Sequence, residues 1–182
     1  MPQRFKLVDQ DFILEKIEYP DRIDEIGALR INAWREEKGI NTAFFSRSSW
    51  IEELDQEAHH WIVTKDNVAI ASARMSFHYS FDSIPYIDLL YGKKLDWYDR
   101  LPVASINRLV VSPAYRGMGL ANLLDKIRVE YAIQAGARLI TAQPLESRVQ
   151  SLGRLGFSLI DQLEPPFQIP ERRIYFMIKE VD

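Results

Sequence analysis

The sequence predicts an α/β fold of the α+β kind, in which helices cover both faces of one mixed central sheet. The first observation behind this prediction is the order of strand and helix patterns, β-α-α-β-β-β-α-β-α-β-β, over 182 residues. The second is an early pair of strands separated by Asp66-Asn67, which is typical of a hairpin. A later strand–helix–strand unit adds a crossover, so the sheet is expected to be mixed.

Length and composition indicate a single domain over residues 1–182. Hydrophobic residues make up 47% and charged residues 27%, which is ordinary for a globular protein with one core. The formal net charge is −3 and the basic residues are scattered. A nucleic-acid-binding module would show a strong basic excess, and a membrane-surface segment would show a basic stripe. We therefore expect neither a nucleic acid nor a membrane as partner.

The chain contains no cysteine, which excludes disulfides, thiolate metal ligands and a cysteine nucleophile. His59-His60 has no third ligand-like neighbour, so no metal site is expected. The first residues lack the apolar core of a signal peptide, and no apolar run approaches the ~20 residues of a membrane span. A cytoplasmic protein is the expectation.

In the N-terminal half, breaker residues mark the ends of the expected elements. Pro20 stops a first strand, Gly39 closes a first helix, and Asp66-Asn67 joins two strands. The elements expected here are strands at 12–19, 60–64 and 68–75, and helices at 21–39 and 48–57.

In the C-terminal half, one helix is especially well marked. Its apolar residues recur at helical spacing and Gly136 caps it. These apolar residues are Leu120, Leu123, Leu124, Ile127 and Tyr131. Ser147 and Gln150 form a capping-box pattern that opens a second, shorter helix. The strands expected in this half lie at 106–111, 138–142, 157–160 and 174–178.

Residues 76–103 fit no simple element and are rich in rings. The aromatic and imidazole residues of this segment are Phe77, His78, Tyr79, Phe81, Tyr86, Tyr91, Trp97 and Tyr98. A long segment of this kind is usually functional or carries small elements of its own. Two interpretations stay open: ordinary core, or the wall of a substrate pocket in which Tyr79 and Tyr86 contact the substrate.

The segment 116–121 places two glycines between a strand and a helix. The first turn of a helix leaves backbone N–H groups unpaired at its positive end, and glycines let a diphosphate approach them. Arg116 adds a cation. A tight connection without ligand would look similar. A dinucleotide-binding turn is excluded, because Asn122 replaces its third glycine and no acid follows residues 138–142.

The whole string over residues 108–121 resembles the signature of the GNAT superfamily of acyl-CoA N-acyltransferases. Its pattern (Q/R)-x-x-G-x-(G/A) is met by Arg116, Gly119 and Ala121, and residues 155–157 also resemble that family. The resemblance implies a largely antiparallel GNAT-type sheet and a bound acetyl-CoA or other acyl-CoA. It further implies cofactor contacts from Leu109, Val110, Val111, Arg116, Gly117, Met118, Gly119, Leu120 and Ala121.

For catalysis, the resemblance implies a backbone N–H at Val110 or Val111 as the oxyanion donor, and Val110 is our first candidate. The tyrosine that usually protonates the leaving thiolate is replaced by Leu152. Ser151, Tyr131 and Tyr175 are possible substitutes, and Ser151 is our first candidate. No carboxylate lies at 105–107, where some relatives have a base. The candidate bases, acting through water, are His78, Asp88 and Glu146, and His78 is preferred because an imidazole titrates near neutral pH.

Residues 107–111 also resemble a strand of autoinducer and N-acyl amino acid synthases, which share the fold. Arg108 is therefore either a substrate-binding residue or part of an ion pair across the sheet. The predicted function is N-acetyl transfer from acetyl-CoA to a primary amine of a small molecule or peptide, by direct attack in a ternary complex. The alternatives are an N-acyl synthase that uses a long-chain thioester, and an acyl-CoA sensor without activity. A homodimer is left open.

Overall fold

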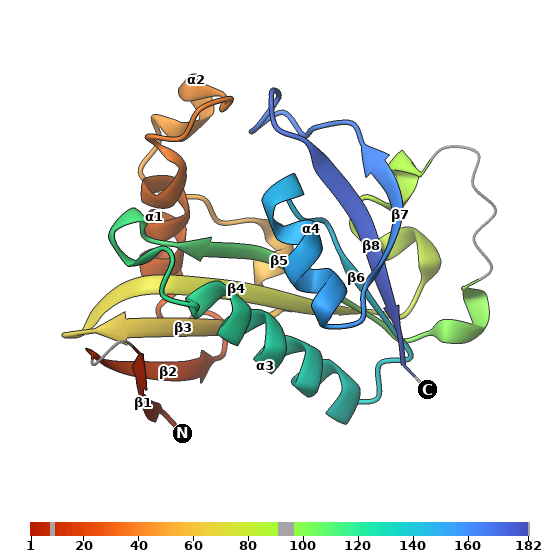
Figure 1. Cartoon of the computed structure of the whole chain (residues 1–182), viewed down its shortest axis with the longest axis horizontal. Coiled ribbons are helices and arrows are strands. Elements are labelled where there is room, and N and C mark those ends of the chain that lie inside the picture. Colours follow the sequence, from red (N-terminus) through yellow and green to blue (C-terminus); the bar gives the residue numbers. More distant parts are fainter. Residues whose placement is uncertain (8–9, 91–96, 182) are drawn as a thin grey trace.

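The computed structural model describes residues 1–7, 10–90 and 97–181. One eight-stranded sheet has the order β1-β2-β3-β4-β5-β6-β8-β7, and β5 and β6 are its parallel pair (Figure 1). The strands are β1 Gln3–Leu7, β2 Gln10–Ile17, β3 His59–Lys65, β4 Val68–His78, β5 Val103–Val111, β6 Leu139–Ala142, β7 Ser158–Leu163 and β8 Ile174–Glu180. The α-helices are α1 Ile23–Trp34, α2 Thr42–Phe45, α3 Leu120–Gln134 and α4 Glu146–Arg154.

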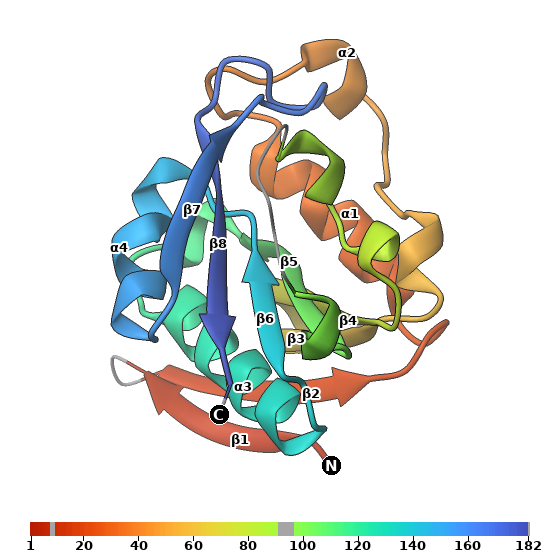
Figure 2. The ribbon, with the colours of Figure 1, turned by 90° about the vertical axis from the view of Figure 1, so that its right-hand side faces the viewer.

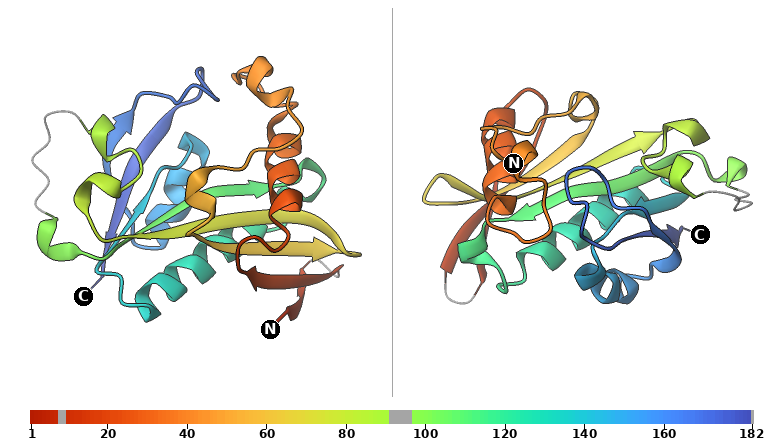
Figure 3. Two further views of the ribbon diagram at one scale, coloured as in Figure 1. Left: turned by 180° about the vertical axis from the view of Figure 1, so that it is seen from behind. Right: turned by 90° about the horizontal axis from the view of Figure 1, so that it is seen from above.

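Helices cover both faces of the sheet, as the sequence predicted. Helices α3 and α4 lie on one face, and α1 lies on the other with the segment that leads to β3 (Figures 2 and 3). Successive side chains of β4 point to opposite faces of the sheet, so each face receives its own set of residues. Met75 is buried in the core on the α3 side, while its neighbours Arg74 and Ser76 point to the α1 side. The predicted mixed, largely antiparallel sheet is confirmed.

The hairpin and the long helix of the prediction are confirmed. Asp66 and Asn67 both have positive φ, 50° and 65°, as a two-residue turn between right-twisted strands requires. Helix α3 begins at Leu120, directly after Gly119, and Gly136 follows its end with a φ of 87°.

The predicted helix over residues 48–57 is wrong. A short helix α2 stands earlier, where the Asn41 side chain accepts from the Phe44 N–H, and residues 53–55 form a single 3-10 turn. Asp55 caps this turn and also accepts hydrogen bonds from Arg30 and Arg74, so long-range pairing sets the local conformation. Edge strand β1 was not predicted; its Phe5 stacks on Phe12 of β2 with ring centroids 5.5 Å apart.

Candidate active site

Strands β5 and β6 begin as neighbours and then part. Their parallel register runs from Val103 opposite Leu139 to Ile106 opposite Ala142, where β6 ends. Strand β5 continues for five more residues, 107–111, still paired with β4 on its other side. In Figure 1 the two strands run apart from a common start. Among the described strands, none pairs with this second edge of residues 107–111, so the edge can pair with an extended ligand.

The direction of the N–H groups along this edge follows from one hydrogen bond. The Ser112 N–H donates to the Ile70 carbonyl of β4 at 2.8 Å. Because successive N–H groups of a strand point to opposite sides, Val110 directs its N–H towards β4 and Val111 directs it to the open edge. Leu109 shares the direction of Val111. The alternation therefore favours Leu109 and Val111 as backbone donors over Val110, the residue chosen from the sequence.

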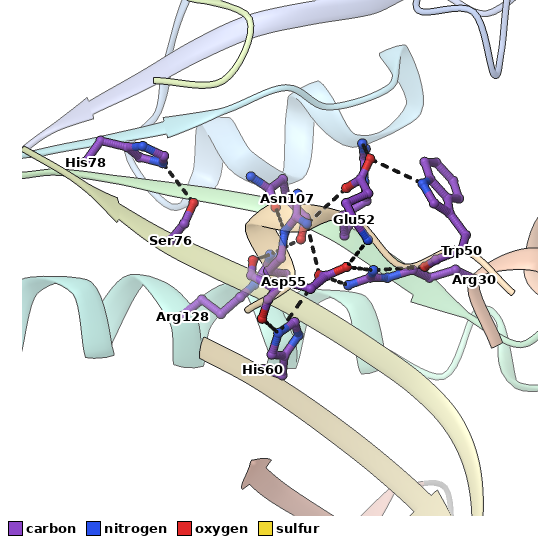
Figure 4. Close-up of polar contacts among 11 residues, drawn as sticks. Arg30, Trp50, Glu52, Asp55, His60, Ser76, His78, Asn107 and Arg128 are labelled. Atoms are coloured by element: carbon purple, nitrogen blue, oxygen red, sulfur yellow. Dashed lines mark hydrogen bonds and ion pairs between the residues drawn. The ribbon is translucent and has the colours of Figure 1, made fainter. Parts of the chain in front are cut away.

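A bulge interrupts the β4–β5 pairing beside this edge. The register shifts between Ser72 opposite Val110 and Arg74 opposite Asn107, and Arg108 has a φ of 50°. Arg128 reaches the bulge from α3, on one face of the sheet. Its Nη1 donates to the carbonyls of Arg74 at 2.8 Å and Asn107 at 3.0 Å (Figure 4). The positive φ of Arg108 is a left-handed backbone conformation that costs a non-glycine residue about 1–3 kcal/mol. The hydrogen bonds from Arg128 help to hold the backbone in this conformation.

The glycine turn lies at the end of the same edge. Gly117 and Gly119 have φ values of 79° and 87°, and a Cβ at either position would meet no atom of the described chain within 4 Å. Both the backbone conformation and the open space around it favour a ligand that approaches the start of α3.

A cavity of about 440 Å³ joins the turn to the open edge of β5. The lining residues from the predicted cofactor set are Leu109, Val110, Val111, Arg116, Gly117, Gly119, Leu120 and Ala121. Met118 is the one predicted cofactor residue outside this lining. The structure thus brings almost the whole predicted set around one space.

Arg116 binds protein groups as well as lining this cavity. Its Nη2 donates to the Ala33 carbonyl at 2.6 Å, its Nε donates to the Val111 carbonyl at 3.2 Å, and Nη1 pairs with Glu37. The guanidinium therefore joins the C-terminal end of α1 to the end of β5. These contacts hold the residue before the glycine turn in place, and the cofactor contact expected from the sequence stays a prediction.

A second cavity, of about 160 Å³, continues from the first into the fork between β5 and β6. The two cavities share Trp34, Leu109, Val110, Leu145 and Arg148. Leu152, the residue at the usual acid position, lines the second cavity and is 3% exposed. Among the described residues, this part of the site offers no tyrosine from α4.

A third, wider cavity of about 570 Å³ meets the second at Tyr86, Asn107 and Arg108. Its other lining residues are Glu52, Glu53, Leu54, Gln56, Glu57, Arg74 and Pro85. Arg108 donates to both carboxylate oxygens of Glu52, at 2.7 and 2.5 Å, and stacks over Trp50. Both sequence interpretations of Arg108 therefore have support, because it is ion-paired and also faces two cavities.

The ion pair belongs to a buried network (Figure 4). Arg30 binds Asp55 through two hydrogen bonds of 2.8 and 2.9 Å, and Arg74 bridges Asp55 and Glu52 at 2.9 Å each. Burial alone would raise the pKa of Glu52, but the hydrogen bonds and charge of Arg108, with the charge of Arg74, lower it to about 2. Glu52 is therefore ionised at neutral pH and is a poor proton acceptor.

Three predicted residues lie outside these cavities. The His78 ring is buried at the end of β4 and hydrogen-bonds Ser76 at 2.8 Å; burial and the charge of Arg74 lower its pKa to about 4. The Tyr79 side chain is 76% exposed. The Ser151 hydroxyl donates to the Arg148 carbonyl at 2.9 Å. The structure does not bring them to the fork, whereas Tyr86 and Arg108 are there.

Several residues around the fork had no place in the sequence analysis. Glu52 and Asp55 lay in a segment interpreted as an ordinary helix, and Arg74, Arg128 and Arg148 are single arginines in regular elements. The one available signal was Arg74, a single charged residue in the largely apolar strand β4. Tyr91 of the aromatic segment lies outside the described residues. In the described part of the chain no group of three histidine or acidic residues could hold a metal ion, and no helix there is long and apolar enough to cross a membrane.

A sheet that forks beside a glycine turn at the start of a helix fits the GNAT-type architecture that the resemblance of residues 108–121 implies. The sequence matches the Acetyltransferase (GNAT) family over residues 23–157, and the chain belongs to this family. Members of the family use an acyl-CoA cosubstrate, and the chain is accordingly an acyltransferase. No match was found among curated protein sequences.

Solved structures agree on the fold. FeeM, an N-acyl amino acid synthase from uncultured soil microbes, is 11% identical with a TM-score of 0.70, covering 100% of this chain and 92% of its own. Arylalkylamine N-acetyltransferase 2 from Aedes aegypti is 16% identical with a TM-score of 0.69, covering 94% and 99%. The AHL synthase LasI is 13% identical with a TM-score of 0.68, covering 94% and 90%. At these identities the likeness concerns the fold alone.

Proposed function

We propose that the protein transfers a short acyl group, such as acetyl, from CoA to a primary amine by direct attack. The observation that carries this proposal is the single cavity that joins the open edge of β5 to the Gly117–Gly119 turn. In this arrangement the pantetheine arm pairs with Leu109 and Val111, and the pyrophosphate binds the N–H groups at the start of α3.

The size of the fork cavity favours a short acyl group. Its volume of about 160 Å³ is below the roughly 300–1,000 Å³ of pockets for drug-sized ligands, so a longer acyl chain would have to extend into the third cavity, where we place the acceptor. A long-chain donor would need a deep apolar tunnel beside residues 77–98, and from that segment Tyr86 alone contributes to this cavity's described lining. The oxyanion of the tetrahedral intermediate would accept from the Leu109 N–H.

The acceptor amine would enter through the third cavity. Glu53 and Glu57 on its rim carry negative charge that attracts an ammonium group, and Tyr86, Asn107 and Arg108 lead on to the fork. Glu52 is tied to Arg108, so the amine would lose its proton to solvent before the attack.

Binding and turnover test the proposal together. We expect CoA, acetyl-CoA and short acyl-CoA to raise the unfolding temperature, and a panel of primary amines to release CoA thiol from acetyl-CoA. Stabilisation without thiol release from any amine would instead support the sensor alternative. Preferential turnover of a long-chain thioester would support the synthase alternative.

Gly119 and Gly136 provide a matched pair of variants. Both have a φ of 87°, and both have open space where a Cβ would stand, but Gly119 lines the first cavity and Gly136 lies at the far end of α3. Leucine therefore adds similar backbone strain at either site. Gly119→Leu should abolish CoA binding while Gly136→Leu retains it. Equal affinities in the two variants would place the cofactor elsewhere.

A further inference from the structure

The inference below rests on the proposed function and concerns the leaving group. Leu152 offers no proton at the position where relatives have a tyrosine, and none of the expected substitutes lines the fork. Ser151 donates to the Arg148 carbonyl, Tyr131 packs against Trp61 at 5.4 Å, and the Tyr175 hydroxyl contacts Glu146. A thiolate released at the fork needs stabilisation from another group.

Arg148 occupies the place next to Leu152 on the same face of α4. It lies four residues earlier, which is about one helical turn. Of the five described residues that line both the first and the second cavity, Arg148 is the charged one. Its side chain is 27% exposed, so it borders the space through which the thioester must pass.

The charges around Arg148 do not balance. Asp125 is a single carboxylate, 5% exposed, and it accepts from both Arg128 and Arg148. Within residues 1–7, 10–90 and 97–181, the other side-chain partner of Arg148 is the neutral Asn122, whose Oδ1 accepts from Nη1 at 3.0 Å. Two guanidinium groups thus share one anion. Burial lowers the pKa of Arg128, the charge and hydrogen bond of Asp125 oppose this shift, and the charge of Arg148 adds to it, as the repulsion between two neighbouring cations should.

We propose that Arg148 stabilises the CoA thiolate as it leaves, in place of the missing tyrosine. The amine nitrogen attacks the thioester carbon, the C–N bond forms, and the carbonyl electron pair moves to oxygen. When the intermediate collapses, the oxygen electron pair re-forms the carbonyl, the C–S bond breaks and its electron pair goes to sulfur. The nitrogen, positively charged after the attack, releases its extra proton to solvent and leaves a neutral amide. The guanidinium keeps its proton, because an arginine is not deprotonated in proteins, and meets the new charge with charge-assisted hydrogen bonds.

The arrangement also explains why an arginine suffices at this point. A thiol titrates near ~8.5, so its anion needs a positive charge nearby more than it needs a proton. A preorganised positive group that meets charge developing in the transition state typically contributes on the order of 10²–10³-fold in rate. Asp125 accepts a hydrogen bond from Nη2 of Arg148, so the guanidinium is already oriented before the reaction.

Donors with different leaving groups test the proposal. Arg148→Met should lower kcat for acetyl-CoA by about 10²-fold. The same variant should lose far less activity towards S-acetyl thiophenol, whose more acidic thiol leaves without help. Arg148→Lys should keep part of the activity because it keeps the charge. Arg154→Met, on the exposed side of the same helix, is the control and should behave like the wild type.

A second readout does not depend on turnover. The pKa of the thiol in bound CoA, followed through the ultraviolet absorbance of the thiolate, should lie below its free value in the wild type and rise in Arg148→Met. An equal loss with both donors and an unchanged thiol pKa would overturn the proposal. A second contradicting result would be an Arg148→Met variant whose KM rises for acetyl-CoA but not for acetyl-pantetheine, which lacks the pyrophosphate. That result would mean that Arg148 binds the phosphates. The proposed function is tested by the wild-type enzyme alone, through its binding and turnover of acetyl-CoA. If the wild type passes this test, either result above would contradict the role of Arg148 and leave the proposed function intact.

Discussion

The guanidinium of Arg128 in α3 donates to the backbone carbonyl of Asn107 in β5, at the residue where β5 loses its partner β6. The same nitrogen binds the Arg74 carbonyl, and the side chain is 2% exposed. Its Nε also donates to the Leu124 carbonyl at 3.2 Å. Without this arginine, three backbone acceptors and the Asp125 carboxylate would lose a buried donor.

Arg128→Met should therefore destabilise the protein by about 3–5 kcal/mol, the usual cost of removing one partner from a buried ion pair. Arg128→Lys should cost less, because it retains the charge but cannot reach both carbonyls. Urea unfolding measures both, with Arg154→Met as the exposed control. A loss below about 0.5 kcal/mol in Arg128→Met, the range of ordinary surface changes, would contradict the role of Arg128 at the bulge.

The pH dependence of the reaction should follow the acceptor amine. Glu52 has a pKa of about 2 and His78 one of about 4, so neither changes charge near neutral pH. Log kcat/KM should then rise with a slope of one up to the pKa of the amine. Two amines of different pKa, assayed over the same range, check this expectation. A break that stays between pH 6 and about 7 for both amines would reveal a basic group of the enzyme.

Acid stability should depend on the bond between Glu52 and Arg108. The pKa of Glu52 is lowered from 4.5 to about 2 in the folded protein, so the unfolded chain binds the proton more readily between these values. The stabilisation from this carboxylate is therefore complete above about pH 4.5 and is lost as the pH falls towards 2.

Glu52→Gln should lower the free energy of unfolding by on the order of 3 kcal/mol at pH 7 and by far less near pH 2.5. Glu57→Gln, an exposed carboxylate close in the sequence, should show little of this dependence. Urea unfolding at several pH values measures the difference. A gap between wild type and Glu52→Gln that stays constant with pH would mean that this ion pair does not set the pKa.

The elements that the sequence predicted well are those whose signals are local. Two residues of the right type specify the turn at Asp66 and Asn67, and periodic leucines with a glycine on either side specify α3. The glycine turn of the site is local in the same sense. Its positive φ values explain why glycine stands at 117 and 119.

The acceptor side of the site depends on partners that the sequence separates. Glu52 meets Arg108 across 56 positions, and Arg30 meets Asp55 across 25. No helical or strand periodicity marks such pairs. Their hydrogen bonds fix the backbone near Asp55 as a single 3-10 turn, where a helix was expected over residues 48–57. His78 was chosen for its chemistry alone, because an imidazole can act as a base near neutral pH. In the structure it is buried opposite Val103 at the start of β5, outside the lining of the fork cavity.

A tyrosine at position 152 provides the last test of how this site handles the leaving thiolate. The structure places Leu152 in the lining of the fork cavity, one turn after Arg148. In an Arg148→Met background, Leu152→Tyr should restore part of kcat, since a positioned acid contributes about 10²–10⁴-fold. Leu152→Phe in the same background is the matched control, because it adds the ring without the hydroxyl and should cause the same overpacking of about 1–3 kcal/mol. Equal kcat for the tyrosine and phenylalanine variants would show that α4 does not face the sulfur. A tyrosine variant that is faster than its phenylalanine control, at equal stability, would place the departing thiolate between α4 and the open edge of β5.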